Sequence, residues 1–206
     1  MSKKPIIVFE GIEGSGKTYH LNVLANYLKK KKIKFIKIRE PGGSINSEKI
    51  RKLLLKKGNN FNKLTDLFLY MAARNENYIN ILLKNINKKI ILIDRFTDST
   101  IAYQHYGMGV NLKLIKMLNT LILKKINISF TFLNLVNIKN LKLRLKRRGK
   151  LNRYDTFNDN FYTKVQKGFV KLAKNKKNYL IIDSNLPIED NKKKILTKLK
   201  KNWDVN

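Results

Sequence analysis

The chain contains no cysteine among its 206 residues, and histidine occurs only twice, at His20 and His105. Disulfides, thiolate zinc sites and thiol catalysis are therefore excluded, and two histidines are too few to build a metal site alone. Long apolar stretches are missing as well. No signal-like segment opens the chain, and no run approaches the roughly 18 apolar residues of a membrane span. These absences predict a soluble, cytoplasmic protein that does not bind a membrane.

Acidic residues are also scarce, because 14 Asp and Glu stand against 45 Lys and Arg, for a net charge of +31. Such a charge ordinarily suggests a nucleic-acid partner, since clustered Lys and Arg neutralise phosphates and release counterions. Here the lysines are spread along nearly every predicted helix and are interleaved with Asn and Ile. This pattern favours a solvated basic surface over a dedicated patch. The sequence thus predicts no specific nucleic-acid partner, only weak and salt-sensitive attraction to polyanions.

Proline is rare, with three residues near predicted element boundaries, and no linker, repeat or low-complexity block divides the chain. A length of 206 residues with 43% hydrophobic content suits one domain with a sizeable core. The simplest interpretation is a single domain over residues 1–206.

Five short apolar runs recur at intervals too long for hairpins, and each is typical of a buried strand. These runs are Ile6 to Phe9, Ile33 to Ile38, Ile90 to Ile93, Ile128 to Leu135 and Tyr179 to Ile182. Helical patterns occupy Leu21 to Lys32, Ser47 to Lys57, Leu64 to Leu83, Leu112 to Lys124, Ile138 to Arg147, Phe157 to Lys174 and Ile188 to Lys200. Asn111 and Asn137 are N-cap candidates at two helix starts. The alternation predicts an α/β fold with a mainly parallel sheet, covered on both faces, and ligands at the carboxyl ends of the strands.

One segment after the first predicted strand matches the phosphate-binding pattern G-x-x-x-x-G-K-[ST] in full. Its residues are Gly11, Ile12, Glu13, Gly14, Ser15, Gly16, Lys17 and Thr18. In such a loop, backbone N–H groups point at phosphate oxygens, the lysine supplies a cation for the β- and γ-phosphates, and the threonine hydroxyl can ligate magnesium. An ordinary glycine turn is the alternative, which the preceding strand and following helical pattern disfavour. The loop predicts binding of a nucleoside triphosphate but not its use.

Unusual residues follow the second and third predicted strands. Arg39-Glu40-Pro41-Gly42-Gly43 makes a tight turn whose arginine can hold a phosphate bidentately. By itself this segment also fits a solvated Arg-Glu pair. Asp94, directly after four apolar residues, stands where a P-loop enzyme places a carboxylate near its magnesium, and Arg95 is a second candidate for phosphate binding. A purely structural Asp-Arg pair is the alternative.

Two further segments carry candidate binding residues. Tyr70 and Arg74 are four residues apart on one face of a predicted helix, so the aromatic ring could stack on a base while the guanidinium contacts the edge of the same base. Packing of Tyr70 in the core is the alternative. The segment Lys142 to Arg153 holds a dense set of cations interrupted by Gly149. This pattern fits either a solvated face or a segment that closes over phosphates.

Taken together, these segments closely resemble bacterial thymidylate kinase, in order, from residue 6 to about residue 183. The Arg-Glu-Pro-Gly-Gly turn and the run from Asp94-Arg95 through Ser99 to Ala102-Tyr103-Gln104 are far more specific than the P-loop. The resemblance implies a P-loop NTPase-like three-layer sandwich, with a five-stranded parallel sheet flanked by helices and a mobile lid at about residues 142–156. It also implies a homodimer, and transfer of the γ-phosphate of ATP to dTMP, with Mg²⁺, in dTTP synthesis.

The resemblance further implies a role for each matching residue. Lys17 and the amides of the loop would hold the ATP phosphates, and Thr18 would ligate the metal, with Asp94 and Glu40 near it, directly or through water. The dTMP site would comprise Glu13, Arg39, Tyr70, Arg74, Arg95, Ser99, Tyr103 and Gln104. Within it, Glu13 would meet the 3′-hydroxyl, Tyr70 would stack on thymine, and Tyr103 would crowd the sugar 2′ position. The catalytic set would be Lys17, Asp94, Arg95, Arg148 and Arg153.

Two features of this chain refine its resemblance to the family. Its phosphate loop contains no arginine, which resembles the kinases that place the arginine in the lid, so transition-state charge would fall to Arg148 and Arg153, with Arg144 as a nearby candidate. Tyr70 stands where the family most often has phenylalanine. That change preserves stacking but adds a hydroxyl that needs a partner if it is buried.

Two alternative functions follow from the same residues. A deoxynucleoside kinase would phosphorylate a sugar hydroxyl and would need a base, for which Glu40 is the candidate. A nucleic-acid-binding P-loop protein would use the +31 charge and would hydrolyse ATP in response to DNA or RNA.

Overall fold

The computed structural model describes residues 4–124, 126–149 and 151–202. Within these residues, five strands form one parallel sheet in the order β2-β3-β1-β4-β5. The strands are β1 (Ile6–Glu10), β2 (Phe35–Arg39), β3 (Ile90–Asp94), β4 (Phe130–Leu135) and β5 (Tyr179–Asp183). Because all neighbouring strands run parallel, their carboxyl ends meet at one edge of the sheet. The predicted fold class is confirmed.

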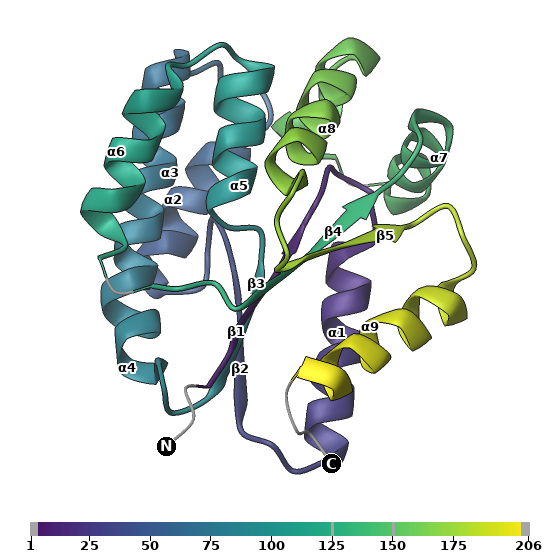
Figure 1. Ribbon diagram of the computed structural model, residues 1–206. Helices are drawn as coiled ribbons and strands as arrows, with labels where there is room; N and C mark the ends of the chain where they lie inside the picture. Colours follow the sequence, from purple (N-terminus) through teal and green to yellow (C-terminus); the bar gives the residue numbers. More distant parts are fainter. Residues whose placement is uncertain (1–3, 125, 150, 203–206) are drawn as a thin grey trace.

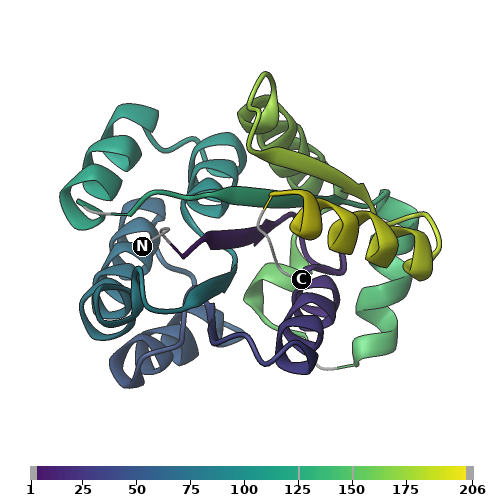
Figure 2. The same ribbon diagram turned by 60° about the horizontal axis from the view of Figure 1, so that its bottom comes forward.

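Helices cover both faces of this sheet, which gives three layers (Figure 1). The helices are α1 (Lys17–Lys30), α2 (Ile45–Leu55), α3 (Lys63–Asn77), α4 (Leu83–Asn85), α5 (Thr97–Thr100), α6 (Leu112–Ile122), α7 (Ile138–Arg148), α8 (Asp159–Ala173) and α9 (Ile188–Asn202). In both views α1 and α9 lie together on one side of the sheet, whereas α3, α4 and α6 lie on the other (Figures 1 and 2). Among the described residues, no helix has the length and apolar character needed to cross a membrane.

Strands β1 and β3 are apolar up to their acidic last residues because both of their faces are buried. Ile7 and Phe9 of β1 belong to the hydrophobic cluster that includes α1 and α9, whereas Ile6 and Val8 belong to a cluster on the opposite face. Successive side chains of a strand point to opposite faces, so burial on both sides requires an uninterrupted apolar run. The apolar runs that form β1 and β3 are therefore a direct consequence of the layered architecture.

All five predicted strands are confirmed, and their observed ends lie within two residues of the predicted ones. Both predicted N-caps are also confirmed: the side chain of Asn111 accepts hydrogen bonds from the backbone of Lys113 and Leu114, and that of Asn137 accepts one from Asn140. Such caps satisfy backbone N–H groups that have no partner within the helix.

The main departure is a helical segment after β3 that the periodicity did not indicate. It comprises α5 and a π-helical stretch, Ile101–Gly107. Two of its polar residues, Ser99 and Gln104, line a cavity rather than face solvent, so the usual alternation of apolar and polar faces is blurred. The predicted helix Leu64 to Leu83 is likewise divided into α3 and a π-helical stretch, Tyr78–Leu82.

Candidate active site

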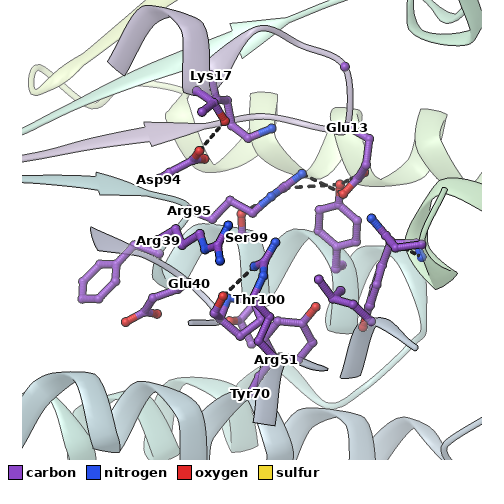
Figure 3. Close-up of a pocket in the computed structure, with 18 of the residues that line it drawn as sticks. Glu13, Lys17, Arg39, Glu40, Arg51, Tyr70, Asp94, Arg95, Ser99 and Thr100 are labelled. Carbon is purple, nitrogen blue, oxygen red and sulfur yellow. Dashed lines mark hydrogen bonds and ion pairs between the residues drawn. The ribbon is translucent and has the colours of Figure 1, made fainter. Parts of the chain in front are cut away.

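A cavity of about 360 Å³ opens at the carboxyl ends of β1, β2 and β3 (Figure 3). In the close-up, Lys17 and Asp94 lie at one end of the cavity, Tyr70 lies at the other, and the Arg95 side chain lies between them. The sequence-predicted residues that line it are Glu13, Gly14, Gly16, Lys17, Thr18, Arg39, Glu40, Tyr70, Arg74, Asp94, Arg95, Ser99, Tyr103, Gln104 and Arg148. Segments from five separate parts of the chain therefore converge on one concave surface.

The phosphate loop has the geometry that its glycines predicted. Gly16 adopts a left-handed conformation, with φ of 83°, immediately before α1 begins at Lys17. At Gly11 a Cβ atom would lie 2.2 Å from the carbonyl oxygen of Asn134, so no larger residue fits beside β4. The loop therefore brings the N-terminal end of α1 directly onto β1, an arrangement suited to anions.

The Lys17 side chain is buried beneath this loop. Its Nζ donates to the carbonyl oxygen of Ile12 at 2.7 Å and lies 3.4 Å from Ser15 Oγ. Burial, followed by repulsion from Arg95, lowers the pKa of Lys17 from its ordinary 10.5 to about 8. The lysine thus retains a proton at neutral pH but has few partners for its charge, which makes it a receptive site for phosphate oxygens.

Two oxygen-bearing side chains meet next to Lys17. Thr18 Oγ1 donates to Asp94 Oδ2 at 2.5 Å, across the gap between α1 and the end of β3. Mg²⁺ prefers hard oxygen ligands and is usually held by one or two protein groups together with phosphates and water. The donor set of Thr18 and Asp94 fits that ion, whereas no cluster of three or more His, Cys, Asp or Glu occurs in the described part of the chain.

Arg95 is fixed at the centre of the cavity. Its NH2 pairs with Glu13 Oε1 at 2.7 Å, and its NH1 donates to the carbonyl oxygen of Gly11 at 2.8 Å. The Tyr103 hydroxyl donates to the other Glu13 oxygen, Oε2. Arg95 also has a φ of 67°, in the left-handed region that few side chains adopt. A strained backbone with a preset guanidinium is a frequent feature of functional sites.

Sequence reasoning missed Glu10, the buried last residue of β1. Its carboxylate accepts hydrogen bonds from the backbone N–H of Phe96 at 2.8 Å and from Ser99 Oγ at 2.5 Å. Burial, with a smaller contribution from nearby Asp98, raises the pKa of Glu10 to about 7. Glu10 thereby ties the turn after Arg95 to the sheet. An acid at the end of an otherwise apolar strand was the available signal.

Two arginines on either side of the turn after β2 line the cavity. Arg39, which the sequence singled out, forms a forked ion pair with Glu48 at 3.1 Å, and its side chain is 56% exposed. Arg51 of α2 also lines the cavity, and its NH1 donates to the carbonyl oxygen of Pro41 at 2.6 Å. Sequence reasoning missed Arg51 because nothing distinguishes it from the many other cations of this basic chain.

Glu40 and Arg74 form a buried ion pair, with Arg74 Nε 2.8 Å from Glu40 Oε2. Burial raises the pKa of Glu40, although the charge of Arg74 opposes this effect. Arg74 also donates to Thr100 Oγ1 at 2.9 Å. Glu40 is thus placed to orient Arg74, and an already paired carboxylate is poorly suited to remove a proton from a substrate. Tyr70, one turn before Arg74, lies edge-on to the ring of Tyr154, at 6.0 Å between ring centres.

The three arginines predicted in the lid segment, residues 142–156, occupy different places; residue 150 lies outside the described residues. Arg148 lines the cavity and pairs with Asp155. Arg144 instead donates to the carbonyl oxygens of Gly14 at 2.8 Å and Ser184 at 2.5 Å. Arg153 also lies away from the cavity lining and pairs with Asp66 at 2.7 Å. Of the three, Arg148 is the one that this structure brings to the cavity.

Comparisons with known proteins agree on one family. A family model described as thymidylate kinase matches residues 9–195. A thymidylate kinase from Wolbachia sp. subsp. Brugia malayi is 38% identical over 188 residues, covering 90% of this chain and 89% of that protein. One from Sulfurihydrogenibium sp. is 38% identical over 198 residues, covering 94% and 96%. The crystal structure of thymidylate kinase from Ehrlichia chaffeensis superposes with a TM-score of 0.78 at 31% identity, covering 97% of this chain and 99% of that one.

Proposed function

This chain belongs to the thymidylate kinase family, and on that premise we propose that it transfers the γ-phosphate of ATP to dTMP, giving ADP and dTDP, as one kinase domain over residues 1–206. The observation that carries the proposal is the convergence of the phosphate loop and the Arg95–Glu13–Tyr103 group on one cavity. The first suits a triphosphate, and the second suits the phosphate and sugar of an acceptor nucleotide. The family assignment does not support the alternative of a deoxynucleoside kinase, and the engagement of Glu40 by Arg74 agrees with this.

The residues around the cavity support an acceptor with a pyrimidine base. Tyr70 presents an aromatic ring for stacking, and Arg74 holds a guanidinium four residues further along α3. Gln104 also lines the cavity, and its Oε1 is buried without a hydrogen-bond partner in the described part of the chain. An unpaired buried acceptor is costly unless a ligand supplies a donor, and thymine carries one at N3.

Phosphoryl transfer in this site needs positioning and charge more than it needs a base. The second pKa of a phosphate monoester is near 6, so the attacking oxygen of dTMP is mostly ionised at neutral pH. Lys17 and Arg95 would align the donor and acceptor phosphates and offset the charge that develops between them. Arg148 would add a third cation from the lid segment, and Arg153 would require release from Asp66 to do the same.

We propose that Thr18 and Asp94 hold Mg²⁺ in this enzyme, with Asp94 ligating directly or through water. Glu40, also expected near the metal, is engaged by Arg74 and would reach the ion only through water. The ion, when bound, supplies positive charge to the phosphate oxygens. Thr18 and Asp94 would position that charge at the Lys17 end of the cavity (Figure 3). We further propose a cytoplasmic location, in keeping with a cysteine-free sequence whose core needs no disulfide.

A panel of phosphoryl acceptors tests substrate and reaction class together. With ATP and Mg²⁺, we expect ADP release with dTMP, less with other nucleoside monophosphates, and almost none with thymidine. Chelation of the metal by EDTA should abolish the dTMP-dependent rate, and added Mg²⁺ should restore it. Turnover of thymidine in preference to dTMP would overturn the proposal. ATP hydrolysis stimulated by DNA or RNA without a nucleotide acceptor would favour a nucleic-acid-dependent enzyme instead.

We also propose a homodimer, formed through adjacent faces of α3 and α6. Both helices contribute to one hydrophobic cluster, yet each also leaves a pair of apolar residues exposed, four positions apart. These pairs are Leu64 and Phe68 on α3, and Met117 and Leu121 on α6. Residues four apart share one side of a helix, so the two pairs form an apolar surface suited to a second copy of the chain.

The substitution Phe68→Glu tests this surface. Phe68 is 52% exposed, so the change should leave the fold intact while it places a charge where apolar contact is needed. We expect sedimentation equilibrium to give twice the chain mass for the wild type and a mass near that of one chain for the variant. Ile188→Glu is the matched control, because Ile188 is 53% exposed and begins α9, a helix on the other side of the sheet (Figure 1). A dimeric Phe68→Glu variant would contradict the proposed surface.

A further inference from the structure

Asp66 of α3 is a fully buried carboxylate that lies behind the cavity rather than in its lining. Three groups surround it. Its Oδ2 accepts from the hydroxyl of Tyr154 at 2.5 Å and from Nε2 of Gln104 at 3.2 Å. Its Oδ1 lies 2.7 Å from NH2 of Arg153 in an ion pair that is not aligned as a hydrogen bond. Every neighbour that contacts Asp66 in this way is a donor.

This environment determines which end of the Gln104 amide faces Asp66. A carboxylate paired with a guanidinium only accepts hydrogen bonds, so it must receive the NH₂ group of the amide. The Tyr154 hydroxyl already donates its single proton to Asp66 Oδ2. Gln104 Nε2 is therefore committed to Asp66, and Oε1 is left as the free polar atom of a side chain that lines the cavity. The assignment of amide nitrogen and oxygen follows from the hydrogen-bond network.

We propose that Asp66 is a positioning residue that determines base specificity by holding the Gln104 amide with its oxygen available to the acceptor nucleotide. The inference rests on the proposed function. Thymine and uracil carry a hydrogen-bond donor at N3, which matches a free Gln104 oxygen. Cytosine carries an acceptor at N3, so a lone pair of cytosine N3 would face a lone pair of Gln104 Oε1. A site with fixed polar groups rejects such a mismatch strongly, because the buried groups are left unpaired.

The substitution Asp66→Asn should reverse this arrangement without changing the size of the side chain. Arg153 has only donors, so the asparagine oxygen should turn toward it, where Asp66 Oδ1 now lies. The asparagine NH₂ group then takes the place of Oδ2, beside Gln104. Two NH₂ groups cannot satisfy each other, so the Gln104 amide should rotate and present its own NH₂ group toward the cavity.

The test compares kcat/KM for dTMP and dCMP, with MgATP, in the wild type and in Asp66→Asn. We expect kcat/KM for dTMP to fall about 10- to 100-fold, mainly through KM, and that for dCMP not to fall. The ratio between the two substrates should therefore decrease by at least about 10-fold, with the KM for ATP unchanged. An unchanged ratio in a folded Asp66→Asn protein would overturn the proposal. Failure of the wild type to phosphorylate dTMP would instead overturn the proposed function itself.

Two further variants separate specificity from stability. Tyr154→Phe removes a hydrogen bond from the same oxygen but keeps the carboxylate, so the substrate ratio should stay within about twofold of the wild type. If Asp66→Asn does not fold, as judged by circular dichroism, Gln104→Leu provides the decisive measurement. It removes the amide and leaves Asp66 in place, and we expect it to lose the preference for dTMP at N3. A wild-type ratio in folded Gln104→Leu would overturn the proposal.

Discussion

Replacing Arg95 with alanine should lower kcat for phosphoryl transfer by about 10³-fold or more, while the affinity for ATP changes little. The guanidinium is held between Glu13 and the carbonyl oxygen of Gly11, in the middle of the cavity. A cation preset in this way offsets developing charge without reorganisation during the reaction. Its removal also leaves the partly buried Glu13 carboxylate without its ionic partner, next to the position proposed for the acceptor sugar. Both effects act on the acceptor side and the transferring phosphate rather than on ATP.

A coupled assay of ADP release measures the loss, and a direct binding measurement with ATP shows whether the donor site is intact. Arg147→Ala is the matched control, because Arg147 is an exposed cation on α7 that does not line the cavity. The control should keep turnover within a few-fold of the wild type. Near-normal turnover in Arg95→Ala would contradict the assignment of Arg95 to the transferring phosphate.

Replacing Lys17 with methionine should reduce kcat/KM for ATP by about 10³-fold, because it removes the one cation that the phosphate loop itself provides. Methionine has nearly the same length and packs well in apolar surroundings, so the loop should keep its shape. Lys37→Met is the control. Lys37 lies on β2, where it donates to Asn22 in an exposed position, and its loss should have little effect. Wild-type catalytic efficiency in Lys17→Met would show that the loop acts through its backbone alone.

The lowered pKa of Lys17 adds a pH dependence to this prediction. Folding shifts that pKa from 10.5 to about 8, so the lysine of the free enzyme loses its proton as the pH rises through about 8. Phosphate binding favours the charged form, and the affinity for ATP, measured by calorimetry, should therefore fall between about pH 8 and pH 10. The same linkage has the opposite sign for folding: below pH 8 the buried charge opposes the folded state. Lys17→Met should accordingly abolish the pH slope of ATP binding and raise the thermal midpoint of the unliganded protein at pH 7.

The linear order of residues determined the fold class and the donor side of the site. A strand buried on both faces is mostly apolar, so the runs that form β1 and β3 could be recognised without any knowledge of their partners. The phosphate loop could also be recognised from local sequence alone. Its function depends on the conformations of eight consecutive residues, and its glycines mark the places where the backbone turns left-handed or approaches β4 closely. Asn111 and Asn137 cap the helices that they directly precede, so they too required only local information.

The acceptor side depended on contacts between distant residues, which only the tertiary structure could decide. Glu40 is paired with Arg74, 34 residues away, which turns a candidate base into an orienting group. Glu10 meets the segment after Arg95 only because β1 and β3 are neighbours in the sheet. In the sequence Asp66 is one acid on an ordinary helix, yet in the structure it accepts from or pairs with three donors in two distant segments, Gln104 in one and Arg153 and Tyr154 in the other. Local sequence encodes backbone conformation and burial. The role of a buried charged group depends instead on which partner the tertiary structure places beside it, because a buried charge needs a partner.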